Sequence, residues 1–437
     1  MRRLVDGKSF VADAHAVCYV GAFPLMKLKA LGWLGLLAVT GCILVSPSPK
    51  HFAGIAPLVW SQRLAASEMA RRGDSLAWKP HGKAKWDYTA GLFTLALLKL
   101  NEVAPDARYV AFSRNAIGSF VAEDGRIATY KMSEYQLDAI NPGKTLLALA
   151  AADPVHPRAY YSGATLLALQ FLAQPRTPDG GFWHKQKYTN QMWLDGIYMS
   201  APFYCAMGRY LTTPDQAYDE VAKQIRLIDR HTYDARTGLN YHGWDAAKIQ
   251  PWANPLTGCS SNFWGRGEGW YAMALVDLLD DFPTNHPARA EIIATLQKTA
   301  RGIVNWQDAK TGLWWQVLDQ GGRKGNYLEA TASAMFVYAL AKGVNHDYLS
   351  RDYIPAINQG YAGIIKHLLK PDGPNSWSLT QCCSVAGLGG SPGSRHYRSG
   401  SFDYYISEPV VTNDLKGVGP FILAGIEMRQ LAAAKNQ

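Results

Sequence analysis

Twelve stretches of this 437-residue chain carry apolar residues at spacings of three and four, whereas alternation of the β type is scarce. Spacing of this kind predicts helices. A chain of this length is also acceptable for one large barrel. The expected helices are 55–72, 87–100, 105–121, 142–152, 157–174, 195–211, 215–230, 267–281, 287–306, 329–343, 353–369 and 418–433.

The twelve predicted helices alternate in character. Those that begin at 87, 142, 195, 267, 329 and 418 are apolar nearly all round and start with small residues, as at Gly417 and Gly419. A helix that is apolar on all sides is buried, whereas the other six carry more charge and are amphipathic. Six buried helices alternating with six surface helices predict an all-α fold, the (α/α)6 barrel. A helical solenoid would need a more regular period.

The loops before the buried helices hold most of the polar and aromatic side chains of interest. In a barrel of this kind these loops converge at one end, so we expect an active site there. Two longer segments, 231–266 and 370–416, feed the same rim, and the second is rich in Gly and Ser. We expect that segment to form part of a cleft wall or a lid.

Asp195 is the strongest catalytic candidate among these rim residues. It follows Met192, Trp193 and Leu194 directly. Apolar surroundings disfavour the charged carboxylate and raise its pKa, so Asp195 is predicted to stay protonated near neutral pH and to act as a proton donor. The alternative is a helix N-cap role. Asp138 has a similar setting, which favours the catalytic interpretation.

The N-terminal region predicts export. Lys27 and Lys29 form a basic segment, the apolar run 31–39 follows, and 39–42 (Val-Thr-Gly-Cys) resembles a bacterial lipoprotein box with Cys42 as the lipidated residue. An ordinary signal peptide or a short membrane anchor are the alternatives. Met26 is a candidate start. We predict an extension and export signal at 1–42, a linker at 43–54 and a catalytic domain at 55–437, located in the periplasm or anchored to a membrane.

Composition excludes several other classes of protein. The formal charge is +9, and it becomes +6 without residues 1–42, which hold five basic and two acidic residues. Such a surface suits an anionic ligand, but no basic block indicates nucleic acid. Beyond Cys42 only Cys205, Cys259, Cys382 and Cys383 remain, without metal-ligand spacing. We therefore predict no disulfide framework, no metal and no organic cofactor.

Several motifs, taken in order, resemble the unsaturated glycuronyl hydrolases. They are Trp86-Asp87-Tyr88, Leu137-Asp138-Ala139-Ile140-Asn141-Pro142-Gly143, Gln191-Met192-Trp193-Leu194-Asp195, His242-Gly243-Trp244-Asp245 and Phe263-Trp264-Gly265-Arg266-Gly267-Glu268-Gly269-Trp270. The similarity is greatest to glycoside hydrolase family 105, the unsaturated rhamnogalacturonyl hydrolases, and family 88 is related. It covers roughly residues 55–435. It also implies an (α/α)6 fold, in agreement with the helix count.

The resemblance implies roles for particular residues. Asp195 matches the general acid/base of the family, and Asp138 matches its second carboxylate. The positions that match the sugar pocket are Tyr88, His184, Lys185, His242, Trp264, Arg266 and Trp270. From the residues alone, Arg266 suits a uronate carboxylate or a structural ion pair. Trp264 and Trp270 suit sugar stacking or the core, and each His suits a sugar contact or a structural hydrogen bond.

The implied substrate is an oligosaccharide made by a polysaccharide lyase, with a C4–C5 double bond in its terminal uronic acid. Asp195 would protonate C4, and its carboxylate would then activate the water that adds at C5, after which the hemiketal opens and releases the neighbouring sugar. Asp138 would repel negative charge on Asp195, so that the pair titrates as a unit, or hold sugar hydroxyls. Rhamnose after unsaturated galacturonate is the family default, and unsaturated glucuronate is the alternative.

Two other functions fit parts of the sequence. A conventional glycosidase or a polysaccharide lyase on the same barrel would act on saturated chains. An exported lipoprotein that only binds oligosaccharides is the third option, although pure binding does not require two apolar-flanked acids. Oligomeric state does not follow from the sequence.

Overall fold

The computed structural model describes residues 50–73, 76, 85–391, 393–394 and 396–433. These residues fall in one compact unit. The predicted export signal and the predicted lipidation of Cys42 lie outside the described residues. In the part of the chain that is described, no helix is both long and apolar enough to cross a membrane.

Six helices form a closed inner ring, in which each contacts the next and the last contacts the first. Most side chains of these helices are buried, because the helices are largely apolar on all sides. The ring consists of α2 (Tyr88–Val103), α4 (Gly143–Ala152), α6 (Leu194–Gly208), α8 (Gly265–Leu278), α10 (Ala330–Asn345) and α13 (Leu415–Ala433).

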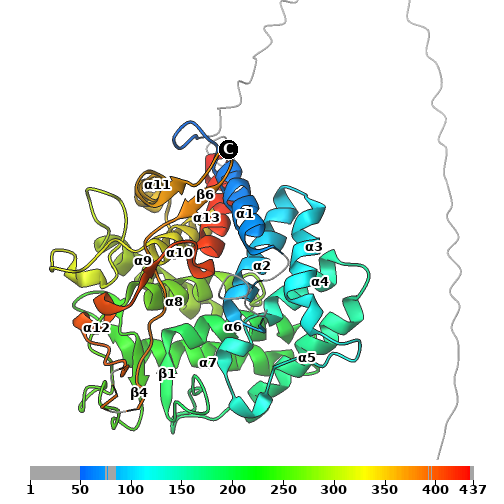
Figure 1. Ribbon diagram of the computed structural model, residues 1–437. Helices are drawn as coiled ribbons and strands as arrows, with labels where there is room; N and C mark the ends of the chain where they lie inside the picture. Colours follow the sequence, from blue (N-terminus) through cyan, green and yellow to red (C-terminus); the bar gives the residue numbers. More distant parts are fainter. Residues whose placement is uncertain (1–49, 74–75, 77–84, 392, 395, 434–437) are drawn as a thin grey trace, which may run out of the picture. The chain divides into compact units, whose positions relative to one another are not determined.

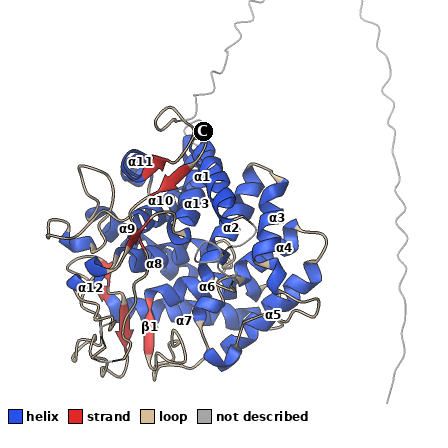
Figure 2. Ribbon diagram, viewed as in Figure 1, coloured by secondary structure: helices blue, strands red, loops and turns tan. Residues whose placement is uncertain are grey.

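Each inner helix packs against one outer helix, so the described chain is a double-layered barrel. Figures 1 and 2 show α3, α5 and α11 at the periphery, with α6, α8 and α10 nearer the middle. The outer helices are α1 (Pro57–Arg72), α3 (Ala107–Ala116), α5 (Pro157–Ala173), α7 (Pro214–Thr232), α9 (Arg289–Asn305) and α11 (Ile354–Gly363), which continues as the π-helical turn η6 (Ile364–Leu368). The predicted (α/α)6 fold is confirmed.

One predicted helix is shorter than expected. The segment 105–121 is helical only over α3, and it then breaks into the 3₁₀ turn η1 (Gly118–Phe120). The break lies where the chain passes close to Tyr160: a Cβ atom on Gly118 would lie 2.8 Å from its hydroxyl oxygen. The short helix α12 (Phe402–Ser407), in the Gly- and Ser-rich segment, was not predicted.

Small residues at the starts of inner helices allow close packing, as the sequence predicts. A Cβ atom on Gly91 would lie 2.8 Å from the backbone of Pro142, and one on Gly143 would lie 2.5 Å from the ring of Phe203. Contacts that short force the structure to shift, so α2, α4 and α6 approach one another only because these positions lack side chains.

Four two-stranded antiparallel ladders lie in the loops between helices. They fix the long connections against the barrel, so that rim side chains far apart in sequence meet. The pairs are β1 (Gln191–Trp193) with β4 (Gly243–Asp245), β2 (Tyr233–Asp234) with β3 (Leu239–Asn240), β5 (Leu369–Pro371) with β6 (Trp377–Leu379), and β7 (Cys382–Cys383) with β8 (Val410–Val411). The 3₁₀ turns are η2 (Met132–Glu134), η3 (Leu137–Ala139), η4 (Leu318–Gln320) and η5 (Arg351–Tyr353).

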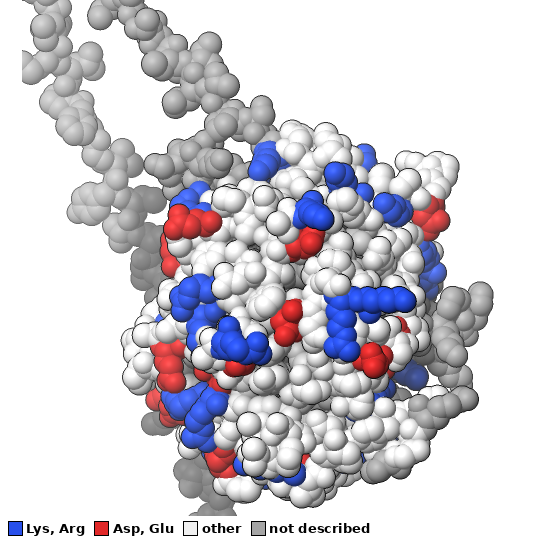
Figure 3. Space-filling view, turned by 90° about the vertical axis from the view of Figure 1, so that its left-hand side faces the viewer, with Lys and Arg blue, Asp and Glu red and all other residues white. Residues whose placement is uncertain are grey.

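On the face shown in Figure 3, basic and acidic side chains are interspersed. The positive formal charge of the chain is therefore not gathered into a single basic patch on that face.

Candidate active site

The predicted catalytic and binding side chains lie at or near the N-terminal ends of the inner helices. Tyr88 is the first residue of α2, Asp195 lies in the first turn of α6, and Arg266 lies in the first turn of α8. Asp138 belongs to η3, just before α4. Inner and outer helices alternate along the chain, so the inner helices all begin at the same end of the barrel. The loops before them therefore meet at that end, as predicted.

The β1–β4 ladder brings Asp195 and His242 together. Trp193 pairs with Gly243 in the ladder, and the backbone N–H of Leu194 donates to the carbonyl of His242 at 3.0 Å. Asp195 directly follows Leu194, and its Oδ2 lies 3.1 Å from Nε2 of His242. The Asp195 side chain is 14% exposed and that of His242 is fully buried, so the carboxyl is the part of this pair that a ligand reaches.

Tyr405, on α12, extends this pair into a chain of three groups. Its hydroxyl lies 2.8 Å from Nδ1 of His242. Burial raises the pKa of Tyr405 well above its ordinary value, so the phenol keeps its proton. When the Tyr405 oxygen accepts from Nδ1–H, Nε2 of a neutral His242 is an acceptor, to which a protonated Asp195 can donate. Tyr405 can therefore hold His242 in the tautomer that a general acid at Asp195 needs.

We expect Tyr405→Phe to lower kcat roughly threefold to tenfold with little change in KM, because one neutral hydrogen bond is lost and nothing in direct contact with the sugar is removed. The measurement is the pH profile of kcat for both proteins. A positioning role predicts a displaced profile in the variant. A profile of unchanged shape and height would assign Tyr405 to packing alone.

Asp138 lies at the centre of a second group of polar residues. Its Oδ2 is 2.5 Å from Nζ of Lys185, and its Oδ1 is 3.2 Å from Nε2 of His184. The backbone N–H of Leu137 donates to the carbonyl of His184 at 3.1 Å, which fixes the two segments together. Burial opposes ionisation of Asp138, but Lys185 and His184 outweigh it and hold the pKa of this carboxyl well below its usual range.

This geometry separates the two roles considered for Asp138. Its negative charge is compensated by Lys185, which weakens the expected repulsion of charge on Asp195. A carboxylate with a low pKa is a poor proton donor, but it accepts hydrogen bonds from hydroxyl groups well. The structure therefore favours the second role, in which Asp138 holds sugar hydroxyls.

Trp193 connects the two acid groups. Its ring stacks on His184 with centroids 4.7 Å apart and meets His242 edge-on at 5.5 Å. Tyr188 also stacks on Trp193, at 4.6 Å. A rigid aromatic plate of this kind fixes the rotamers of both histidines.

The three aromatic residues predicted to line the pocket differ in position. Tyr88 is half-buried, and Asp138 contributes to raising its pKa, after burial itself. Trp270 is buried, stacks on Tyr198 at 4.9 Å and contacts the Tyr88 ring at 6.2 Å, so it supports the site from beneath. Trp264 is buried too, which agrees with the core alternative for both tryptophans.

Arg266 is engaged by the protein itself. Its Nη1 donates to the carbonyl of Cys383, and its guanidinium lies 4.6 Å from the ring centroid of Trp264. Oε1 of Glu329 accepts from the N–H of Cys383 at 2.8 Å. The backbone N–H of Cys383 is thus held by the Glu329 carboxyl group, and its carbonyl is held by the Arg266 guanidinium. Burial acts to lower the pKa of Arg266, but the surrounding acidic groups, including Glu329, raise it above its ordinary value.

Glu268, one helical turn beyond Trp264, points away from this site. Its Oε2 accepts from the backbone N–H of Asn240 at 3.0 Å. The Glu268 carboxyl is fully buried, and this burial raises its pKa to about 8. An unfolded glutamate has an ordinary pKa of about 4.5, so between that pH and about 8 the folded state holds a proton that the unfolded state has lost. Folding stability conferred by this group is present at low pH and is lost as the pH rises from about 4.5 through about 8.

We expect Glu268→Gln to be more stable than the natural chain by roughly 5 kcal/mol at pH 9 and about equally stable at pH 4, because Gln keeps an acceptor for Asn240 and carries no buried charge. Urea unfolding at the two pH values measures the difference. A gain that is the same at both values would show that ionisation of Glu268 is not its cause.

Metal chemistry has no evident ligand set here. In the ranges that the structure describes, no three His, Cys, Asp or Glu side chains are placed to hold a metal ion. The four cysteines within those ranges are free and buried.

Sequence reasoning missed Tyr405 and the part that Glu329 plays around Cys383. Tyr405 lies 163 positions from His242 in the chain, and no local motif marks it. Glu329 had a visible signal, since it directly precedes the apolar run of α10 and serves as the helix cap, accepting from the N–H of Ala332 at 2.6 Å.

Comparison with known proteins places this chain among glycoside hydrolases. The family model described as Glycosyl Hydrolase Family 88 matches residues 60–432. Protein Atu3128 of Agrobacterium fabrum is 40% identical over 238 residues, which cover 54% of this chain and 100% of that protein. The unsaturated rhamnogalacturonyl hydrolase YesR of Bacillus subtilis is 27% identical over 263 residues, 58% of this chain and 70% of the relative.

A solved structure supports the same placement. The glycoside hydrolase of family 105 from C. acetobutylicum ATCC 824 superposes with a TM-score of 0.79 at 38% sequence identity. The match covers 84% of this chain and 99% of that one.

Proposed function

The chain belongs to glycosyl hydrolase family 88 and is therefore a glycoside hydrolase, and we propose that it releases the terminal 4,5-unsaturated uronic acid from oligosaccharides made by polysaccharide lyases. The proposed preferred substrate is unsaturated galacturonyl-rhamnose. The 27% identity to the unsaturated rhamnogalacturonyl hydrolase of Bacillus subtilis and the motifs at Asp138 and Asp195 support it.

The observation that carries this proposal is the pairing of a reachable carboxyl with a buried imidazole. Asp195 lies 3.1 Å from His242, and the separate carboxylate Asp138 is compensated by Lys185 at 2.5 Å. One acid is thus connected to a group that exchanges protons, while the other carries a fixed charge. Acid/base chemistry on a single residue needs this division of labour.

In the proposed reaction Asp195 donates its proton to C4 of the alkene, and positive charge develops at C5 and the ring oxygen. The Asp195 carboxylate then removes a proton from the water that adds at C5. His242 stays hydrogen-bonded to Asp195 through both steps. The hydrated product is a hemiketal, which opens and releases the neighbouring sugar. Asp138 accepts hydrogen bonds from hydroxyls of the terminal sugar and so fixes its orientation.

A panel of unsaturated disaccharides tests the proposal. The C4–C5 alkene absorbs in the ultraviolet, so its loss reports hydration directly. We expect the highest kcat/KM for unsaturated galacturonyl-rhamnose and a lower one for unsaturated glucuronides. The saturated disaccharides serve as the control. Cleavage of these at a comparable rate would favour a conventional glycosidase, and a binding protein would consume none of them.

We propose that the protein is exported and anchored to a membrane through acylated Cys42, on the strength of residues 39–42. A single acyl chain binds membranes only marginally, so stable anchoring requires a multiply acylated terminus. Cys42→Ser is expected to release the protein into the soluble fraction or to block its processing. Mass spectrometry of the native protein is the decisive measurement: an unmodified N-terminus beyond residue 42 would contradict the anchor.

A further inference from the structure

A second cavity lies toward the C-terminal ends of the inner helices, away from the rim that carries Asp195. Its volume is about 590 Å³, within the range of small-molecule sites. Five inner helices contribute residues near their C-terminal ends, and Lys144 enters from the first turn of α4: the five residues are Glu102 of α2, Ala152 of α4, Ala206 of α6, Asp277 of α8 and Lys342 of α10. The proposed catalytic chemistry uses none of these residues.

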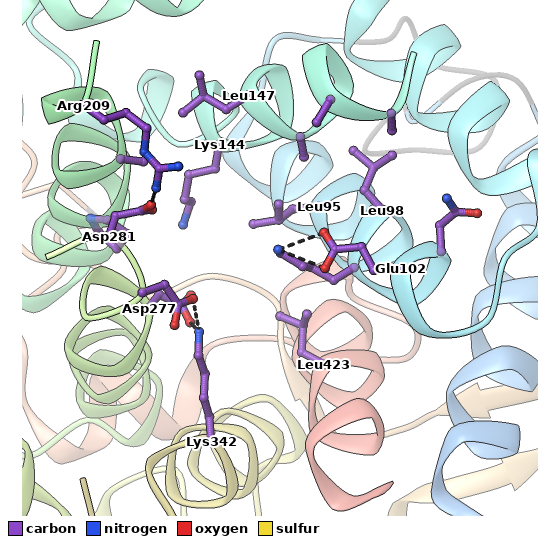
Figure 4. A pocket seen from close by; sticks show the side chains of 18 of the residues that line it. Leu95, Leu98, Glu102, Lys144, Leu147, Arg209, Asp277, Asp281, Lys342 and Leu423 are labelled. Atoms are coloured by element: carbon purple, nitrogen blue, oxygen red, sulfur yellow. Dashed lines mark hydrogen bonds and ion pairs between the residues drawn. The ribbon is translucent and has the colours of Figure 1, made fainter. Parts of the chain in front are cut away.

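The floor of this cavity is a polar network. Nζ of Lys342 lies 2.8 Å from Oδ1 of Asp277 and 2.6 Å from Oδ2 of Asp280. The hydroxyl of Tyr338 donates to Oδ1 of Asp277 at 2.6 Å. Figure 4 shows Lys342 and Asp277 meeting in this network. These contacts use the donors of Lys342 and Tyr338, but each carboxylate keeps lone pairs that can accept from the hydroxyl groups of a ligand.

Lys144 adds a buried donor without a hydrogen-bond acceptor among the described residues. Figure 4 shows its side chain reaching into the space that Leu95, Arg209 and Asp277 surround. Its Nζ lies 3.4 Å from the ring centroid of Tyr198. Burial lowers the pKa of Lys144 to about 7. A ligand oxygen at this position would supply the missing acceptor and offset the cost of burying the amine.

The mouth of the cavity carries two exposed aromatic rings. Tyr161 of α5 is 38% exposed and Tyr210 is 51% exposed, and their ring centroids are 5.4 Å apart. Both residues line the cavity. Exposed aromatic rings beside a dense polar network suit sugars, whose C–H faces pack on aromatic rings while their hydroxyls bind polar groups.

The charges of the lining decide which kind of sugar fits. Four basic and four acidic side chains line the cavity, so its formal charge is balanced. A uronate would meet Asp277, Asp280 and Glu102 without an excess of positive charge to compensate. An uncharged sugar needs no such compensation.

We propose that this cavity is a second carbohydrate-binding site, which holds an uncharged mono- or disaccharide at the end of the barrel opposite the catalytic rim. Tyr161 and Tyr210 contact a face of the sugar ring, Lys144 and Asp277 bind its hydroxyls, and Lys342 holds Asp277 in place. The proposal does not depend on which uronide the catalytic rim cleaves.

A titration of the Asp195→Asn protein with L-rhamnose or D-galactose, in which NMR measures binding of the sugar, tests the site. The titration is run twice, without and with saturating unsaturated disaccharide, which occupies the catalytic rim of this inactive variant. We expect saturable binding of an uncharged sugar in the millimolar range and weaker binding of D-galacturonate. Absence of saturable binding, or its loss when the catalytic rim is filled, would overturn the proposal.

A matched pair of surface variants locates the site. Tyr210→Ala is expected to weaken the binding of the uncharged sugar roughly threefold to tenfold, because it removes one ring contact. Leu172→Ala is the control, since Leu172 is 78% exposed, lies on α5 and does not line the cavity. Lys144→Met is the second site variant and is expected to weaken binding as well. Equal affinity in the Tyr210 and Leu172 variants would show that the sugar binds elsewhere.

Discussion

Asp195→Asn is expected to lower kcat on unsaturated disaccharide by ~10²–10⁴-fold, the usual cost of losing a general acid/base. Asparagine keeps the shape of the side chain and a hydrogen-bond partner for His242, but it cannot deliver a proton to C4. Substrate binding should change much less, because the sugar contacts of Asp138 and its neighbours remain. The alkene absorbance measures turnover, and the change in KM shows whether binding is intact.

Asp138→Asn is the matched control for this experiment. The two carboxyl side chains are similarly accessible, at 14% for Asp195 and 16% for Asp138, so both substitutions are made in comparable surroundings. If Asp138 holds hydroxyls of the substrate, its substitution raises KM as well as lowering kcat, and leaves Lys185 without its acid partner. Near-normal turnover by the Asp195 variant, together with an inactive Asp138 variant, would instead assign the general acid/base role to Asp138.

The barrel itself could be predicted because the pattern of apolar and charged residues that specifies each helix lies within one continuous stretch of the chain. Each inner helix is apolar on all sides over a single continuous stretch, such as 330–345, whereas outer helices such as α7 carry charged residues on one side and apolar residues on the other. Burial dictates that pattern residue by residue, so the order of buried and surface helices follows from the sequence. The break at Gly118 could not be predicted, because it depends on the approach of Tyr160 from another helix.

The candidate site was only partly predictable for the same physical reason. Asp195 and Asp138 have distinctive neighbours along the chain, and the motif at His242 marks a third position. The sequence did not show which side chains contact each of the two acids. His242 meets Asp195 because of a three-residue ladder, and Lys185 compensates Asp138 across 47 positions. The charge state of Asp138 depends on that second contact, which is why the sequence left open whether Asp138 repels charge on Asp195 or holds sugar hydroxyls.

Arg266 remains a prediction with two physical explanations, and they give different expectations for Arg266→Lys. If the guanidinium binds the uronate carboxylate, lysine loses the two-pronged geometry, and kcat/KM should fall roughly tenfold to hundredfold. The loss should be far smaller on an analogue whose carboxylate is esterified, because that contact is already weakened. If Arg266 acts by holding Cys383, the losses on the acid and on the ester should be equal.

The structure gives the second explanation a concrete basis and supplies its control. Arg266 is 1% exposed, donates to the carbonyl of Cys383 and shares this segment with Glu329. Glu329→Gln disturbs the same segment without removing the guanidinium, so it should impair the acid and the ester substrates alike. A greater loss on the acid than on the ester in Arg266→Lys, but not in Glu329→Gln, would assign the carboxylate contact to Arg266. Equal losses in both variants would assign Arg266 to the support of β7 at the rim.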